Sequence, residues 1–259
     1  FIQRQAKAKS PFFMMIGWTH SHYPSVTAPE FTGKSSIGPY GDAILELDHR
    51  TGEVLAAIKD AGIENNTIVI WLSDNAATPI SGPPEYRGGN NGPFRGELGD
   101  AMEGSIRVPG MIKWPGNIAP GENNELVSIH DFLPALASIL GVDLPTDRAY
   151  DGVDQSAFFT GKQKTSNREH LITFIENEVA AVRWHQFRIY PKEFVLSGGN
   201  PARPGLGGHR AEMTSMPAVY NIEYDPQEKD NLVATKAWVF RPYMKAIGDY
   251  YKSLAKYPN

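Results

Sequence analysis

The sequence predicts an α/β fold in which a mostly parallel sheet is flanked by helices and followed by a small antiparallel sheet with a terminal helix. Two apolar runs bounded by turn residues, at 11–18 and 67–73, are typical of buried parallel strands. Apolar residues recur at helical spacing over 40–61, so the three segments predict a right-handed βαβ unit. Beyond Gly161 the pattern changes to the alternation of antiparallel strands.

The later elements of the α/β part have clear punctuation. Gly62 is expected to end the first helix, because glycine adopts the left-handed conformation that follows many helices. Residues 107–114 predict another strand, closed by Pro-Gly. Residues 129–140 predict a helix with Pro134 in its first turn, where proline is tolerated, and Gly141 as its stop.

The C-terminal part is predicted to form the antiparallel sheet from segments 171–174, 180–190 and 218–224. A loop rich in glycine and proline, 197–208, interrupts these strands. The terminal helix, 238–256, is expected to pack five side chains, namely Val239, Tyr243, Met244, Ile247 and Leu254.

The change of pattern predicts two domains, 1–162 and 163–259. Residues 76–106 are expected to form a long irregular segment, and segments of that length in a compact domain are usually functional or disordered. Substrate specificity is expected to reside in the loops 76–94 and 193–216, because loops carry binding residues on a rigid scaffold.

Composition excludes several classes of protein. The 25 basic and 29 acidic residues give a formal charge of −4, which does not indicate a nucleic-acid partner. No apolar run approaches the ~20 residues of a membrane span. Cysteine is absent, which excludes disulfides, thiolate metal sites and a cysteine nucleophile within these 259 residues.

The strand 67–73 runs directly into Asp74 and Asn75. Open α/β sheets bind their ligands at the carboxyl ends of strands, and two oxygen donors there suit Ca²⁺ or Mg²⁺ better than zinc. A simple turn is the alternative, because both side chains readily bond their own backbone. The pair is therefore the candidate metal site.

His20 and His22 follow the first predicted strand, two residues apart. On an extended segment both side chains point the same way, which is compatible with zinc. Two other interpretations stay open: loop histidines without a chemical role, or a general acid or anion-binding group.

Two further groups have a structural and a functional interpretation. Arg95 and Arg107 can hold an anion, but a structural ion pair between Arg107 and Glu103 is favoured over that role. His130 and Asp131 suggest a catalytic dyad, although Asp131 is better explained as a residue that caps or begins a helix.

Several segments, taken in order, resemble the second half of a type I sulfatase, of the arylsulfatase branch of the alkaline phosphatase superfamily. The similarity covers almost all 259 residues, and the ordered set of motifs is more specific than any single one. The matching segments are Pro11-Phe-Phe, Thr19-His-Ser-His22-Tyr-Pro24, Gly41 to Ile70, Ser73-Asp74-Asn75, Pro93-Phe-Arg-Gly to Glu103-Gly-Ser-Ile-Arg-Val-Pro, and Tyr220-Asn-Ile-Glu-Tyr-Asp-Pro-Gln-Glu-Lys-Asp-Asn-Leu232.

The resemblance implies hydrolysis of a small-molecule or carbohydrate sulfate ester by a formylglycine nucleophile beside Ca²⁺, with Mg²⁺ as an alternative. It implies Asp74 and Asn75 as metal ligands and His22 as a sulfate-binding residue that protonates the leaving oxygen. Arg95, in the segment that resembles the family's anion-side loop, is the further candidate for a substrate-binding residue. It also implies a periplasmic, secreted or lysosomal protein with an alkaline phosphatase-like fold.

Two departures from the family pattern are visible. The nucleophile motif and the first metal-binding Asp pair are expected in a preceding segment, so the 259 residues alone are expected to hydrolyse nothing. Leu98 stands where the family usually has lysine, and Gly104-Ser105 replaces a usual Gly-Gly. Hydrolysis of phosphate or phosphonate esters therefore stays an alternative, as does an inactive homologue acting as a binding or structural module.

Overall fold

The structure is a computed structural model that describes residues 1–8, 10–78, 88–175, 177–192, 194–196, 211–213 and 217–257. It divides into two compact units. Unit 1 comprises residues 1–90 and 108–116, and unit 2 comprises residues 91–107 and 117–259. The predicted boundary at residue 162 lies inside unit 2.

Unit 1 contains the elements α1 (Ile2–Ala8), α2 (Pro39–Asp60), η1 (Glu64–Asn66), β1 (Val69–Leu72) and β2 (Gly110–Lys113). The predicted helix 40–61 is confirmed as α2, which begins with Pro39. Gly62 has a φ of 71°, and the N–H of Ile63 bonds back to the carbonyl of Ile58 at 3.3 Å. This is the left-handed glycine stop expected from the sequence. The short α1 has no counterpart among the predicted elements.

The sheet of unit 1 corrects the predicted βαβ unit. β1 pairs with β2 in antiparallel register, from Val69 opposite Lys113 to Leu72 opposite Gly110. All strand pairs among the described residues are antiparallel. β1 is also half-buried along its whole length rather than buried.

The predicted strand 11–18 is wrong for this structure. Residues 11–18 belong to no strand, and Phe13 and Met15 are 82% and 83% exposed. An apolar run indicates that a segment tends to be buried, but a strand also needs a neighbour for its N–H and C=O groups. No such neighbour lies among the described residues, so the run stays irregular.

Unit 2 is built around an antiparallel sheet with the order β3-β4-β5-β8. Its strands are β3 (His170–Ile175), β4 (Glu178–Trp184), β5 (Phe187–Tyr190) and β8 (Ala218–Asn221), and β6 (Phe194–Leu196) pairs separately with β7 (Ala211–Met213). The predicted antiparallel sheet is therefore confirmed. The segment 180–190, predicted as one strand, is a hairpin whose turn contains His185 at a φ of 49°.

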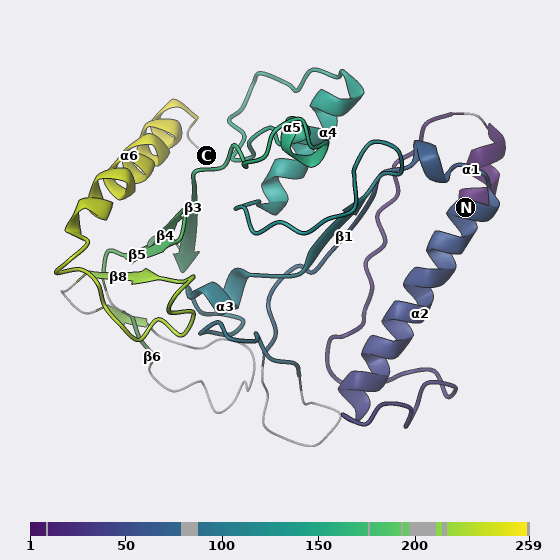
Figure 1. The fold of residues 1–259 in the computed structure, drawn as a ribbon, viewed down its shortest axis with the longest axis horizontal. Helices are drawn as coiled ribbons and strands as arrows, with labels where there is room; N and C mark the ends of the chain where they lie inside the picture. Colours follow the sequence, from purple (N-terminus) through teal and green to yellow (C-terminus); the bar gives the residue numbers. More distant parts are fainter. Residues whose placement is uncertain are drawn as a thin grey trace. The chain divides into compact units, whose positions relative to one another are not determined.

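The terminal helix α6 (Phe240–Lys256) follows η4 (Ala237–Val239) and packs on β3 and β4 (Figure 1). Val239, Tyr243 and Ala246 join the buried side chains of Val182 and Ile189 in one core cluster. The predicted packing of Leu254 is wrong, because this side chain is 37% exposed, and that of Met244 is wrong, because this side chain is 63% exposed. Its position on α6 faces away from the row formed by Tyr243 and Ala246.

Four short helices of unit 2 precede β3 in the chain. They are η3 (Ile129–Asp131), α4 (Phe132–Leu140), α5 (Ser156–Phe159) and, earlier in the chain, α3 (Glu103–Ile106). The predicted helix 129–140 is confirmed, with Pro134 in the first turn of α4 and Gly141 at a φ of 65° after it. The predicted loop 197–208 and much of the loops 76–94 and 193–216 lie outside the described residues.

None of the helices in the described ranges is both long enough and apolar enough to span a membrane.

Candidate active site

The carboxyl end of β1 presents Asp74 and Asn75 in a tight local turn. One oxygen of Asp74, Oδ1, accepts the N–H of Asn75 at 3.0 Å and the hydroxyl of Ser73 at 3.4 Å. Ser73 also donates to the carbonyl of Asn75 at 3.0 Å. The alternative interpretation, in which these side chains bond their local backbone in a turn, is therefore confirmed for Asp74. The second oxygen of Asp74 accepts no hydrogen bond from any described residue, and the side chain is exposed.

This donor set fits part of a divalent-cation site. A carboxylate oxygen and an amide oxygen are hard donors of the kind that Ca²⁺ and Mg²⁺ prefer. Ca²⁺ takes about six to eight oxygens. Within the described ranges no three His, Asp or Glu side chains gather as a metal-binding group. Asp74 and Asn75 can therefore supply two ligands, and a complete site needs donors from elsewhere.

His22 lies in the loop that precedes α2, and its side chain is exposed. Its Nδ1 donates to the carbonyl of Tyr23 at 2.6 Å, and the two rings stack with centroids 4.6 Å apart. Because a carbonyl only accepts, Nδ1 carries the proton in the neutral ring. Nε2 is then the nitrogen that can exchange a proton with another molecule.

The loop that carries His22 is fixed to α2 by Glu46. One carboxylate oxygen of Glu46 accepts the N–H of Ala28 at 2.9 Å and lies 3.2 Å from Nε2 of His20. The other accepts from Arg50 at 3.3 Å. The N–H of Ala28 is the main reason why the pKa of Glu46 lies below its ordinary value. His20 is thus engaged with a carboxylate, and the described residues do not provide the further ligands that zinc requires.

A second carboxylate of α2 holds the following stretch of the same loop. Asp42 is buried and accepts the N–H groups of Gly33 at 2.8 Å and Ser35 at 2.6 Å. The bond from Ser35, followed by that from Gly33, holds the pKa of Asp42 below its usual range. Motif reasoning missed both anchors, because an acidic residue on a helix normally indicates only a solvated face.

Arg95 lies in unit 2 and is bound to a turn late in the chain. Its N–H donates to the carbonyl of Pro226 at 2.9 Å, and its guanidinium donates to the carbonyl of Glu228 at 3.1 Å. The predicted structural pair is confirmed: Arg107 donates to Glu103 at 3.3 Å. The guanidinium of Arg107 also lies over the ring of Phe94, 4.4 Å from its centroid.

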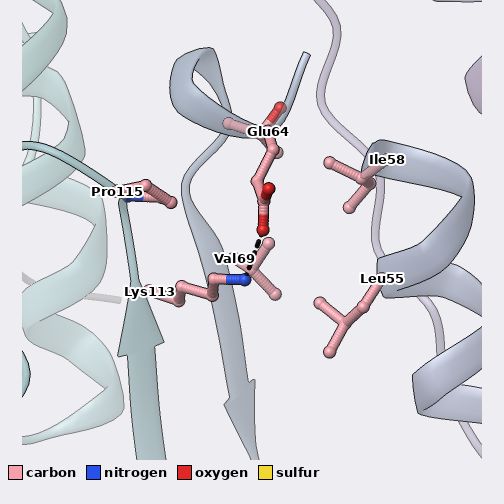
Figure 2. A pocket seen from close by; sticks show the side chains of 7 residues that line it. Leu55, Ile58, Glu64, Val69, Lys113 and Pro115 are labelled. Carbon is pink, nitrogen blue, oxygen red and sulfur yellow. Dashed lines mark hydrogen bonds and ion pairs between the residues drawn. The ribbon is translucent and has the colours of Figure 1, made fainter. Parts of the chain in front are cut away.

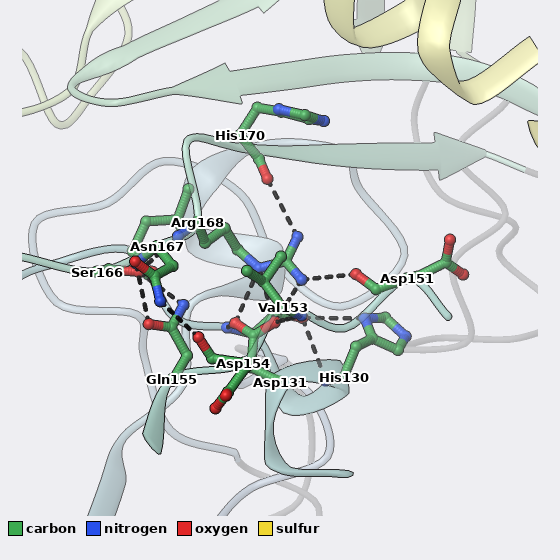
Figure 3. Close-up of polar contacts among 12 residues, drawn as sticks. His130, Asp131, Asp151, Val153, Asp154, Gln155, Ser166, Asn167, Arg168 and His170 are labelled. Atoms are coloured by element: carbon green, nitrogen blue, oxygen red, sulfur yellow. Dashed lines mark hydrogen bonds and ion pairs between the residues drawn. The ribbon is translucent and has the colours of Figure 1, made fainter. Parts of the chain in front are cut away.

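His130 and Asp131, for which a catalytic dyad is the less favoured interpretation, form a structural arrangement. Asp131 accepts the N–H groups of Ser128 at 2.8 Å and Val153 at 2.7 Å, and Nε of Arg168 donates to it at 2.8 Å (Figure 3). His130 lies 2.9 Å from the hydroxyl of Ser128 rather than near the carboxylate. The predicted role of Asp131 at a helix start is confirmed by its reciprocal cap with Ser128.

Arg168 is the partner that motif reasoning missed, because 37 residues separate it from Asp131. It also donates to the carbonyls of Asp151 at 2.7 Å and His170 at 3.2 Å (Figure 3). Burial raises the pKa of Asp131, but the bonds from Arg168, Ser128 and Val153 lower it more, so the pKa lies below its ordinary value. This ion pair joins the segment 117–162 to the residues that lead into β3.

A hollow between α2, β1 and β2 is a poor candidate for a substrate site. Lys113 and Glu64 form an ion pair at 2.6 Å across it, and Leu55, Ile58 and Val69 line its apolar side (Figure 2). Its volume of about 10 Å³ is close to the space that one water molecule needs. An ester substrate does not fit.

The four predicted site residues are thus only partly brought together. Asp74 and Asn75 are adjacent and joined by a hydrogen bond. His22 belongs to the same unit, but its hydrogen bond stays within its own loop. Arg95 belongs to unit 2. Their assignment to one site stays a prediction.

Comparison with known proteins identifies the class. The family model described as "Sulfatase" matches residues 1–142, more than half of the 259-residue chain. The chain therefore belongs to the sulfatase family. A solved structure of the PsFucS1 sulfatase from Pseudoalteromonas sp. superposes with a TM-score of 0.81 at 30% identity, over 93% of this chain and 48% of that chain.

Three curated relatives illustrate the range of similarity. The chain is 36% identical over 239 residues to steryl-sulfatase of Rattus norvegicus, covering 86% of this chain and 41% of the relative. The chain is 34% identical over 254 residues to arylsulfatase A of Homo sapiens, covering 95% of this chain and 48% of the relative. It is 41% identical over 243 residues to N-acetylgalactosamine-6-sulfatase of Mus musculus, covering 88% of this chain and 46% of the relative. The chain thus spans less than half the length of these relatives.

Proposed function

We propose that the full-length protein hydrolyses a sulfate ester and that this chain supplies part of its active site. Membership of the sulfatase family supports the reaction class. The observation that carries the site is the end of β1, where Asp74, beside Asn75, has one carboxylate oxygen that accepts no hydrogen bond from any described residue. A small-molecule or carbohydrate sulfate ester is the proposed substrate, in keeping with the names of the relatives.

Asp74 and Asn75 are proposed to hold a divalent cation, Ca²⁺ or Mg²⁺, together with ligands of the full-length protein that lie outside these 259 residues. When bound, such a cation offsets the charge of the sulfate oxygens. The open oxygen of Asp74 and the side-chain oxygen of Asn75 are the donors that this chain contributes. The turn that joins them through Ser73 fixes their backbone, which limits the entropy lost on binding.

His22 is proposed to protonate the leaving oxygen. The carbonyl of Tyr23 engages Nδ1, so Nε2 is the atom that would hold the transferred proton. An imidazole suits this step because one ring nitrogen can donate a proton while the other keeps its hydrogen bond. Glu46 fixes the loop that carries the ring, through Ala28 and His20.

Arg95 is proposed to bind the anionic group of the ester. Its guanidinium uses one N–H on the carbonyl of Glu228, and its other N–H groups make no hydrogen bond with a described residue. Guanidinium N–H groups bind oxyanions through charge-assisted hydrogen bonds. The nucleophile, a formylglycine by resemblance to the family, is proposed to come from outside these 259 residues, which contain no cysteine.

The mostly parallel sheet implied by the resemblance is part of this proposal for the full-length protein. It requires strands outside the described residues, because β1 has an antiparallel partner on one edge only. The small two-stranded ladder of unit 1 would then be one part of a larger sheet.

The test is an assay of the full-length protein with a matched pair of aryl esters, one sulfate and one phosphate. Hydrolysis of the sulfate ester with a higher kcat/KM supports the proposal. Preference for the phosphate ester favours the second candidate function, which is hydrolysis of phosphate or phosphonate esters. The specific observation behind this candidate is Leu98 in place of the usual lysine. Failure to hydrolyse any ester, with the protein folded and its nucleophile motif intact, favours an inactive homologue.

A further inference from the structure

The turn at 225–228 is the support on which the Arg95 segment rests. The carbonyl of Pro226 accepts the N–H of Arg95 at 2.9 Å, and the carbonyl of Glu228 accepts from its guanidinium at 3.1 Å. The side chain of Gln227 donates to the carbonyl of Pro93. More than 130 residues separate the two segments along the chain, so these bonds are tertiary contacts rather than local turns.

Glu228 closes the far end of the same contact. Its Oε1 accepts the N–H of Glu103 at 3.0 Å, and the N–H of Gly104 donates to the carbonyl of Arg95 at 2.7 Å. Residues 95 and 104 are therefore pinned to each other and to the turn. A Cβ at Gly104 would lie 2.6 Å from the carbonyl oxygen of Arg95, so only glycine allows this approach.

The side chain of Glu228 is held in place on its other side as well. It is 1% exposed, and its second oxygen accepts from the hydroxyl of Tyr190. Tyr190 in turn accepts from Nε of Arg188 at 3.0 Å. Burial raises the pKa of Glu228 above its usual range, although Arg188 opposes the shift. A buried network in which the polar groups bond to one another is rigid, so these hydrogen bonds hold the side chain of Glu228 in place.

The backbone of Glu228 is also in an uncommon conformation. Its φ is 50°, in the left-handed region that residues other than glycine rarely adopt. Such a conformation persists where the surroundings over-determine it. Here it directs the carbonyl of Glu228 at the guanidinium of Arg95.

We infer that Glu228 is a positioning residue that fixes the orientation of the Arg95 guanidinium for binding the anionic group of the ester. This inference rests on the proposed function, which assigns Arg95 that role. Glu228 acts through Arg95 and through the 93–104 segment, and it does not itself contact the substrate.

The kinetic test uses the full-length protein with an aryl sulfate. Glu228→Ala is expected to raise KM roughly tenfold with a small change in kcat, because it weakens ground-state and transition-state binding alike. Glu228→Gln keeps an acceptor for the N–H of Glu103 and is expected to recover most of the loss. Glu223→Ala, an exposed glutamate nearby, is the matched control and is expected to match the unmodified protein.

A double variant separates positioning from general structural damage. In an Arg95→Ala background, Glu228→Ala is expected to change KM no further, since the residue through which it acts is gone. A full tenfold increase in that background would overturn the inference, as would a loss confined to kcat.

Hydrogen exchange in the full-length protein tests the same contact independently of its activity. Glu228→Ala is expected to speed exchange at the amides of Arg95 and Gly104 at least tenfold, while the amides of α6 keep their rates. Unchanged exchange at both amides would overturn the inference. An inactive full-length protein with faster exchange would refute the proposed function and leave the anchoring by Glu228 established.

Discussion

The end of β1 and the start of α4 each present an aspartate beside a short polar motif, and the two carboxylates have opposite surroundings. Asp74 is exposed, accepts bonds only from its immediate neighbours and keeps one oxygen open among the described residues. Asp131 is fully buried, and both of its oxygens accept hydrogen bonds from Arg168 and from two backbone N–H groups.

The difference separates binding chemistry from architecture. A carboxylate with all its acceptor positions filled by protein has nothing left for a ligand, and its removal leaves a buried guanidinium unpaired. A carboxylate with an open oxygen contributes little to stability but is available to a cation. Glu103 of unit 2 is a second buried carboxylate with its oxygens bonded to protein, because it accepts from Arg183, Arg188 and Arg107.

The largest expected effect is on the buried aspartate. Asp131→Ala in the 259-residue chain is expected to lower the free energy of unfolding by about 3–5 kcal/mol, because it strands the charge of Arg168. Asp74→Ala, the matched control, is expected to change it by less than about 0.5 kcal/mol. Urea denaturation of both variants measures the contrast, and equal losses would remove the distinction between the two sites.

The second effect concerns catalysis in the exposed region. His22→Ala in the full-length protein is expected to lower turnover roughly 100-fold for esters with the poorest leaving groups and far less for the best ones. Stability is expected to stay within about 0.5 kcal/mol, because the ring is exposed. A series of aryl sulfates with graded phenol acidity measures the trend. An equal loss across the series would argue against proton donation by His22.

A smaller effect is expected from pH. The folded-state pKa of Asp131 lies below its ordinary value, so its contribution to stability is present above about pH 4 and is lost as the pH falls through the folded-state pKa. The stability difference between the unmodified chain and Asp131→Asn is therefore expected to shrink below about pH 4. Denaturation of both at stepwise lower pH measures it. A constant difference down to pH 3 would contradict the assignment.

Much of the local structure was predictable because it depends on short stretches of chain. The apolar periodicity of α2 and α4 and the glycines that follow them, Gly62 and Gly141, identify both helices. The strand β1, which ends at Leu72 shortly before Asp74, is likewise visible as an apolar run. Each of these signals lies within the element that it predicts.

The remaining features depend on partners far along the chain. Nothing near Asp131 indicates Arg168, and nothing near Arg95 indicates the turn at Pro226. The prediction of strand pairing was wrong for the same reason, because the apolar run of β1 does not specify β2 as its antiparallel neighbour. The run 11–18 has the composition of a strand, but composition does not supply a partner.

Calcium binding to the full-length protein tests the central claim most directly. Isothermal titration of Ca²⁺ into the unmodified protein, Asp74→Ala and Asp48→Ala compares the candidate ligand with an exposed aspartate of α2. Asp74→Ala is expected to weaken binding at least roughly tenfold, the equivalent of about 1.4 kcal/mol, and Asp48→Ala to leave it unchanged. If Asp74→Ala binds Ca²⁺ as tightly as the unmodified protein, the end of β1 is not a metal site.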